Sequence, residues 1–403
     1  MSFISYEQSQ QMLSQLHIGS IKTENVFLGD ALERTLATAV IADENSPKHP
    51  TASMDGYAVR HTDLTSGRIK ILGDNPAGSD ERREVTEGTC IKTFTGSMMP
   101  SGADTLIQIE NVTVEGDDIL INEAVSLASS VRPVGESYFE GDILIPQGTQ
   151  IGFAEIGVMA GLNKVMVPVS VKPKVAVIAT GSEVLDLGVT AKNEAQIRSS
   201  NNYTIAAIAK SAGADVVQLG VTHDNRATIM QTFENALQSA DIVVSTGGVS
   251  VGDYDFVKEI VPALGATVIY KGVRVKPGQH IMVAQRDNRF ILALPGFAYS
   301  STVTFILYAL PLIRKMLGRD SEPNLIEATL KAPFIKRSKK SEFTTCNLSF
   351  EEGKYWVDFQ NKKVGSSAIL TNMLGNAALM VTGEDDGSLE EGTTVHVIKL
   401  DRF

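Results

Sequence analysis

Three acidic residues, each a few positions after an apolar run, are the first candidates for chemistry in this chain. Glu183, Asp224 and Asp255 stand at the ends of what read as successive strands. Two carboxylates ~4 Å apart repel by about 4 kcal/mol at an effective dielectric of 20, so a converging group needs a cation or a shifted protonation state. Hard oxygen ligands on several loops suit Mg²⁺. The pattern predicts a site for Mg²⁺ or another divalent cation.

Loops with free backbone N–H groups accompany these acids. Thr180-Gly181-Ser182 leaves an apolar strand, and Gly247-Gly248-Val249-Ser250 combines paired glycines with hydroxyls. Glycines permit close approach of the backbone to a phosphate, and N–H groups that leave a strand or open a helix bind anions. Pro295-Gly296, with Ser300 opening the next helix, gives a third predicted anion site.

Three basic residues stand close together in Lys271-Gly-Val-Arg274-Val-Lys276-Pro-Gly. In a chain that is acidic overall, such a group beside a rigid turn suits an oxyanion or a pyrophosphate. Lys276, next to the Pro-Gly turn, is the best single candidate.

Each of these features also has a purely structural interpretation. Gly181 could be a plain turn residue and Glu183 a solvated acid at a helix start, while Asp224 and Asp255 could cap helices. Lys276 could be a solvated lysine on an edge strand. The hydroxyls after Pro295-Gly296 could cap their own helix. The residues alone leave both interpretations open.

The elements that must position these residues form an alternating strand and helix pattern over 174–322. Val175–Ala179 and Asp241–Ser245 are apolar strands, and Asp215–Val221 is a third. Apolar residues three and four apart predict helices over Asn201–Ala212 and Arg226–Ser239. This pattern predicts an open, mostly parallel α/β sheet, in which ligands bind past the carboxyl ends of the strands.

The segments on either side of the α/β region are richer in β-forming residues. Val26–Pro173 also contains more Gly and Pro, and two of its tight turns, Ser53–Arg60 and Thr93–Pro100, combine hydroxyls with the carboxylate of Asp55. Asn324–Phe403 carries short strands. Pro168, Pro173 and Pro323 are plausible domain boundaries.

Bulk composition excludes several classes of protein. The 403 residues are 43% hydrophobic and 21% charged, which is typical of a folded multidomain protein. Lys plus Arg number 36 against 47 Asp plus Glu, and a net charge of −11 argues against nucleic acid as a partner. Only Cys90 and Cys346 are present, which favours a cytoplasmic location. The longest apolar run is shorter than the ~20 residues that span a bilayer, so no membrane segment is expected.

The ordered set of short motifs closely resembles the molybdopterin molybdenumtransferase family, which includes bacterial enzymes and the C-terminal domain of gephyrin. The order of motifs is similar over nearly the whole chain. The matching stretches are Ser53–Arg60, Thr95-Gly96 with Pro100, Gly102-Ala-Asp, Val131–Glu136, Thr180–Glu183, Ser245–Gly252, Lys276-Pro-Gly and Leu294-Pro-Gly.

The resemblance implies a homodimer of four-domain subunits whose active site is shared between subunits. The implied domains are a helical linking domain (1–44 with 138–173), a β-rich lasso-like domain (45–137), the α/β molybdopterin-binding domain (174–322) and a small C-terminal β-barrel (323–403). Its implied chemistry takes adenylylated molybdopterin and molybdate, releases AMP and leaves molybdenum on the dithiolene. The molybdopterin adenylyltransferase is an implied partner.

Matched position by position, the resemblance implies active-site roles for six residues and ligand-holding roles for four more. The six are Asp55, Thr95, Glu183, Asp224, Asp255 and Lys276, and the four are Gly247, Gly248, Ser250 and Ser300.

The chain departs from the family pattern at Ser137, Ser199, Gly272, Phe297 and Ala298. These departures leave three functions to compare: molybdenum insertion, the same reaction specialised for tungstate, and a pterin-binding scaffold without turnover. The presence of the four implied active-site acids, Asp55, Glu183, Asp224 and Asp255, argues for an enzyme and against the scaffold.

Overall fold

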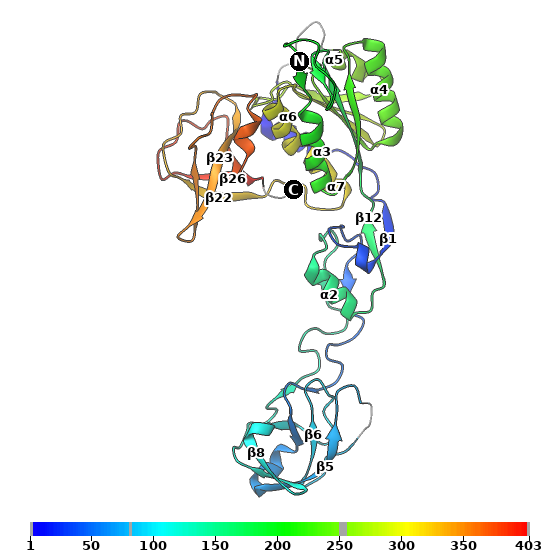
Figure 1. Ribbon diagram of the computed structural model, residues 1–403, viewed down its shortest axis with the longest axis vertical. Helices are drawn as coiled ribbons and strands as arrows, with labels where there is room; N and C mark the ends of the chain where they lie inside the picture. The colour runs from blue at the N-terminus through cyan, green and yellow to red at the C-terminus, as the bar shows by residue number, and fades with distance from the viewer. Residues whose placement is uncertain (1–2, 80–82, 250–255, 401–403) are drawn as a thin grey trace. The chain divides into compact units, whose positions relative to one another are not determined.

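The computed structural model of the chain describes residues 3–79, 83–249 and 256–400 (Figure 1). These residues form two compact units. The larger comprises Met1–Thr38, Gln147–Ile156 and Val165–Phe403, and the smaller comprises Ala39–Pro146 with Gly157–Lys164. The predicted four-domain division, with boundaries near 44, 137, 173 and 322, stays a prediction.

A six-stranded sheet forms the centre of the larger unit. Its order is β16 (Asp215–Thr222), β13 (Lys174–Thr180), β17 (Ile242–Thr246), β21 (Arg289–Leu294), β20 (Met282–Arg286) and β18 (Thr267–Lys271). The first three pairings are parallel and the last two are antiparallel. The sheet is therefore mixed, and its mostly parallel character is not confirmed. The mixed character arises partly because a tight hairpin at Asp287-Asn288 connects β20 directly to β21, and two strands joined in this way are antiparallel.

Helices cover both faces of this sheet (Figure 1). One face packs against α3 (Asn201–Ser211), α6 (Ala298–Thr304) and α7 (Leu310–Met316), the last two being joined by the π-helical turn Phe305–Ala309. The other face packs against α4 (Arg226–Ser239) and α5 (Val257–Ala263). The predicted helices over Asn201–Ala212 and Arg226–Ser239 are confirmed, with Ala212 as the C-cap of α3. Alternate residues of the central strands β13, β17 and β21 enter opposite cores, which explains why their middle residues are apolar.

The C-terminal part of the larger unit is a closed five-stranded barrel. Its strands are β22 (Leu325–Leu330), β23 (Ser341–Glu351), β24 (Lys354–Asp358), β25 (Ala377–Thr382) and β26 (Thr394–Lys399). They follow the order β23-β24-β22-β26-β25, and β25 pairs again with β23 to close the ring. The short strand β19 (Val275–Lys276) pairs with β23, so the Lys276 segment is attached to the barrel.

The smaller unit is built on a six-stranded mixed sheet. Tyr57, Ile69, Ile107 and Ile119 are buried in its core. The strands, in order, are β7 (Thr105–Gln108), β4 (Gly56–Val59), β6 (Thr89–Thr93), β5 (Arg68–Asn75), β9 (Asp118–Ile121) and β8 (Val112–Glu115).

The remaining elements are short. Helix α1 (Tyr6–Ser14) begins with a capping box in which Ser5 and Gln8 bond each other's backbone. Helix α2 (Phe153–Gly161) contributes buried Met159. The paired strands are β1 (Thr23–Phe27) with β12 (Met166–Ser170), β2 (Val40–Ile41) with β11 (Ile143–Ile145), β3 (Thr51–Ala52) with β10 (Val131–Arg132), and β14 (Val184–Leu185) with β15 (Ile197–Arg198). Within the described residues, no helix is both long and apolar enough to cross a membrane.

Candidate active site

A cavity of about 930 Å³ lies past the carboxyl ends of β13, β16, β17 and β21. We call it the main cavity. The loops after these four strands all contribute to its wall, as the α/β pattern predicted. The predicted residues that line it are Thr180, Gly181, Glu183, Asp224, Gly247, Gly248, Pro295, Gly296 and Ser300.

Two hydrogen bonds join the loop after β13 to the loop after β16. The Ser182 N–H donates to Oδ2 of Asp224 over 2.9 Å, and the Asp224 N–H donates to Ser182 Oγ over 3.3 Å. The capping interpretation of Asp224 is wrong, because the N-cap of α4 is Asn225, whose side chain accepts from the Thr228 N–H. Asp224 therefore holds the Ser182 loop in place and keeps Oδ1 for another partner. Ser182 in turn directs its N–H at protein rather than at a ligand.

Glu183 is exposed on the rim of the main cavity, and the two-residue strand β14 follows it, so it does not start a helix. Its carboxylate lies over Gly181, where an added Cβ would come within 2.9 Å of both carboxylate oxygens. Gly181, at φ 142°, has backbone geometry that other residues rarely adopt. The glycine thus leaves room for the carboxylate beside the strand end.

The paired glycines after β17 are required by the close approach of two backbones. Gly247 has φ 90°, and a Cβ there would lie 2.7 Å from the Thr180 carbonyl oxygen. A Cβ on Gly248 would lie 2.8 Å from the Val257 side chain. Ser250 and Asp255, which complete this predicted loop, lie outside the described residues.

At the predicted anion site after β21, no hydroxyl side chain caps the N-terminus of α6. The N-cap of α6 is Phe297, which makes no side-chain cap. The N–H and Oγ of Ser300 both donate to the Ser367 carbonyl, over 3.2 and 3.3 Å. Ser300 therefore ties α6 to the loop before the last part of the barrel, and Phe297 and Ala298 line the main cavity beside it.

Sequence reasoning missed several polar residues of the main cavity. Arg198 and Asn201 line it, and Asn201 donates to the Gly296 carbonyl over 2.7 Å. Ser199 was noted only as a departure from the family pattern. Ser199 is 3% exposed, and its buried Oγ has no hydrogen-bond partner among the residues that the structure describes. A buried hydroxyl in a cavity wall carries an energetic penalty unless water or a ligand bonds to it. The run of polar residues before α3 was the available signal.

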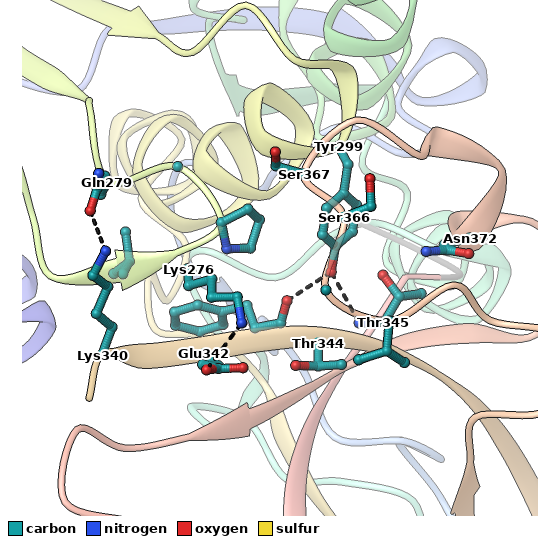
Figure 2. A pocket seen from close by; sticks show the side chains of 16 residues that line it. Lys276, Gln279, Tyr299, Lys340, Glu342, Thr344, Thr345, Ser366, Ser367 and Asn372 are labelled. Carbon is teal, nitrogen blue, oxygen red and sulfur yellow. Dashed lines mark hydrogen bonds and ion pairs between the residues drawn. The ribbon is translucent and has the colours of Figure 1, made fainter. Parts of the chain in front are cut away.

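A side cavity of about 220 Å³ adjoins the main cavity and lies between β19 and the barrel. The two cavities share Gly278, Gln279 and Ser367. Figure 2 shows Lys276 directed at Glu342, and the Lys276 Nζ lies 3.3 Å from its Oε1. On another part of the wall, Lys340 donates to the Gln279 side chain. The side cavity therefore contains two ammonium groups. The carboxylate that pairs with Lys276 is buried, since Glu342 is only 3% exposed.

The solvated-lysine interpretation of Lys276 is wrong, because its ammonium group pairs with a buried carboxylate. Arg274 also has protein partners: its Nε donates to Glu384 over 2.9 Å and its Nη1 to the Phe3 carbonyl over 2.8 Å. Lys271 ends β18 and is half-buried. Neither Arg274 nor Lys271 is among the described residues that line these two cavities. The predicted substrate-binding role of both stays a prediction.

In the smaller unit, Asp55 and Thr95 form a direct pair. The Thr95 N–H and Oγ1 each donate to Asp55 Oδ1 over 2.8 Å. These hydrogen bonds, with a smaller contribution from Lys92, lower the pKa of the exposed Asp55 carboxyl. The motifs that the resemblance matched separately are therefore one local structure.

Among the described residues, no group of three or more His, Cys, Asp or Glu side chains is arranged to hold a metal ion. Glu183 and Asp224 contribute oxygen atoms from two loops of one cavity, and Asp255 lies outside the described residues. The described part of the site thus offers a partial set of hard ligands, which suits Mg²⁺ completed by water and phosphate oxygens.

Family models and individual relatives with related descriptions match most of the chain. Residues 4–162 match the family described as MoeA N-terminal region (domain I and II), and residues 176–315 match the probable molybdopterin binding domain. A molybdopterin molybdenumtransferase of Nostoc sp. is 32% identical over 94% of this chain and 89% of its own length. One from Staphylococcus epidermidis is 30% identical over 98% and 95%.

The fold also matches a solved structure. A molybdopterin biosynthesis MoeA protein from Pyrococcus horikoshii superposes with a TM-score of 0.84 at 25% identity, over 99% of this chain and 100% of that one.

Replacing Thr95 with Val should raise the pKa of Asp55 part of the way toward its ordinary value of about 3.9, because it removes the hydrogen bond from the Thr95 hydroxyl and leaves the one from the Thr95 N–H. In the parent, this lowered pKa stabilises the fold above the unfolded-state pKa, and the contribution is lost as the pH falls through the folded-state pKa. NMR titration of Asp55 checks this. Thr113→Val, an exposed change in the same sheet, is the control. An unchanged Asp55 pKa in Thr95→Val would contradict the assignment.

Lys276→Ala should lower the free energy of unfolding by about 1–3 kcal/mol, because it leaves the buried Glu342 carboxylate without its cation. An exposed lysine would cost only about 0.5 kcal/mol. Urea denaturation of Lys276→Ala, Glu342→Gln and the double variant measures this. The double variant should recover most of the loss. Additive losses would show that the ion pair does not matter to folding.

Proposed function

We propose, since the chain belongs to the MoeA family of molybdopterin molybdenumtransferases, that it inserts molybdenum into molybdopterin during molybdenum cofactor biosynthesis. The substrates are adenylylated molybdopterin and molybdate, and the phosphoanhydride is cleaved with release of AMP. The observation that carries the proposal is the convergence of Glu183, Asp224 and the glycine loop at Gly247-Gly248 on one cavity. The names of the relatives give no support to a tungstate-specific enzyme or to an inactive scaffold.

The main cavity suits a substrate that carries a nucleotide. Its volume of about 930 Å³ is at the upper end of ordinary ligand sites. Ser199 offers a buried hydroxyl that no described residue bonds to, and Arg198 adds a cation to the wall. These groups, with the backbone at Gly247 and Gly296, would bind and orient the phosphates and exclude bulk water from the anhydride.

Glu183 and Asp224 would hold a divalent cation, with Asp255 as a third ligand proposed from the sequence. A bound cation would supply charge neutralisation on the phosphoanhydride oxygens. Oδ1 of Asp224 suits this role because the Ser182 N–H holds the carboxylate through Oδ2. Glu183 is exposed at the rim, so its carboxylate is accessible to a bound cation.

Lys276 would bind the incoming oxyanion in the side cavity. Its pairing with Glu342 uses one of the three ammonium protons, and Lys340 contributes a second cation to the same wall. Because the two cavities share Gly278, Gln279 and Ser367, an oxyanion there would lie next to a substrate in the main cavity.

The proposal includes a homodimer, a cytoplasmic location and an adenylyltransferase that supplies the substrate. Asp55 and Thr95 would act on the main cavity of a second subunit. Apolar side chains support self-association: Phe27 and Met166 are opposite each other in the β1–β12 pair and are 57% and 53% exposed. Phe153, in the same compact unit, is 90% exposed. Both cysteines are free, as expected in a reducing compartment.

Glu183→Gln should lower AMP release by ~10² or more, because it keeps the shape of the side chain and removes a charge needed at the phosphates. Asp255→Asn should do the same. Glu194→Gln, an exposed change in the segment between β14 and β15, is the matched control. The assay follows AMP and metal cofactor formation from adenylylated molybdopterin and molybdate. Turnover at the parent rate in both active-site variants would reject their role.

The chain should sediment as a homodimer at micromolar concentration, because the exposed Phe27 and Met166 carry an energetic cost when solvated. The double variant Phe27→Ser/Met166→Ser should shift it toward monomer. Ile335→Ser, at a side chain that is 67% exposed and precedes barrel strand β23, should leave the dimer intact. A parent that is monomeric and fully active would contradict the shared site.

A further inference from the structure

The N-terminal segment 3–14 contacts the loop that forms the shared wall of the two cavities. The Phe3 ring meets the His280 ring edge-on, with centroids 5.5 Å apart. The same ring lies directly over Gly272, so that a Cβ at this position would collide with it. Gly272 and His280 flank the segment that carries Lys276, Gly278 and Gln279.

Backbone hydrogen bonds fix the register of this contact. The Ile4 N–H donates to the Gly272 carbonyl over 3.3 Å, and the Arg274 N–H donates to the Ile4 carbonyl over 2.8 Å. Arg274 Nη1 also donates to the Phe3 carbonyl. Both the backbone carbonyl and the ring of Phe3 therefore contact the loop.

The same N-terminal segment contacts the barrel side of the side cavity. Tyr6 meets Phe343 edge-on with centroids 5.0 Å apart, and Phe343 lines that cavity. Ser9 Oγ lies 3.1 Å from Tyr308 Oη, and the Gln10 amide donates to the Leu307 carbonyl over 3.2 Å. These contacts fix helix α1 against the core of the larger unit. They therefore also restrict the position of Phe3, which lies three residues before the helix.

The loop is restrained on its barrel side, where β19 pairs with β23 and Lys276 pairs with Glu342. Within the loop, the Gly272 N–H donates to the Ile281 carbonyl over 2.8 Å and the Val273 N–H to the Gln279 carbonyl over 3.0 Å. Gly272 and Gly278 both have positive φ, 79° and 95°. Because glycines allow wide backbone freedom at both turns, the contact of Phe3 with the Gly272 turn adds to the barrel pairing in setting where Lys276 and Gln279 lie.

We infer that Phe3 is a positioning residue for the Lys276–His280 loop, acting through Gly272 and His280 to hold the oxyanion-binding wall in place. This inference rests on the proposed function for the identity of the oxyanion. Phe3 contacts no substrate. Its loss should leave the Glu183 and Asp224 carboxylates of the main cavity in place and should weaken only interactions made through the loop.

The test compares Phe3→Ala with Phe3→Tyr and with Glu7→Ala, an exposed change on α1. Aromatic contacts contribute about 0.5–1.5 kcal/mol, which corresponds to roughly two- to tenfold in an equilibrium. Hydrogen exchange of the peptide 272–281 should quicken by that factor in Phe3→Ala, while exchange in β13 and β17 stays at the parent rate. The KM for molybdate should rise by a similar factor, and the KM for adenylylated molybdopterin should rise less, because the loop forms only part of the main-cavity wall. Phe3→Tyr should restore both values, and Glu7→Ala should alter neither.

Equal exchange in the 272–281 peptide of parent and Phe3→Ala would overturn the inference. So would an equal rise in both KM values, because that pattern would indicate a general structural role. If the parent releases no AMP, the proposed function fails, and the exchange measurement still decides whether Phe3 positions the loop.

Discussion

The close approach of the loops after β13 and β17 is the constraint on which the site depends. Gly247 lies so near the Thr180 carbonyl that a Cβ would stand 2.7 Å from it. The Thr180 hydroxyl also donates to the Thr246 carbonyl over 3.3 Å. Because parallel strands end at one edge of a sheet, this contact brings the Ser182–Glu183 turn and the glycine loop together. Asp224, from the next strand outward, then bonds to Ser182 and completes the described wall.

The barrel completes the site from the other side. Ser367 accepts both hydrogen bonds of Ser300 at the start of α6, and it lines the main and the side cavity. Glu342 on β23 pairs with Lys276. Substrate phosphates and the oxyanion would therefore bind on neighbouring walls built by different parts of the larger unit. This arrangement suits a reaction that joins a metal oxyanion to a bound pterin while a nucleotide leaves.

Local sequence signals predicted the α/β core well, because fully buried strands and amphipathic helices have distinct patterns. The helix Arg226–Ser239 has the bounds that its apolar spacing predicted. The hairpin at Asp287-Asn288 was missed, and with it the mixed character of the sheet. The partners of Lys276 and Arg274 lie 66 and 110 residues away, in Glu342 and Glu384. No local pattern carries such pairings. Asp55 and Thr95 needed the family resemblance, because in sequence each is only part of a turn.

In the proposed reaction, the residues around the main cavity couple phosphoanhydride cleavage to metal insertion. A single-turnover experiment tests this coupling with the parent protein, adenylylated molybdopterin and Mg²⁺, run with and without molybdate. We expect AMP and molybdenum cofactor to form in equal amounts, and omission of molybdate to slow AMP release strongly. AMP release at the same rate without molybdate, or no AMP release in its presence, would show that the two steps are not coupled in this way.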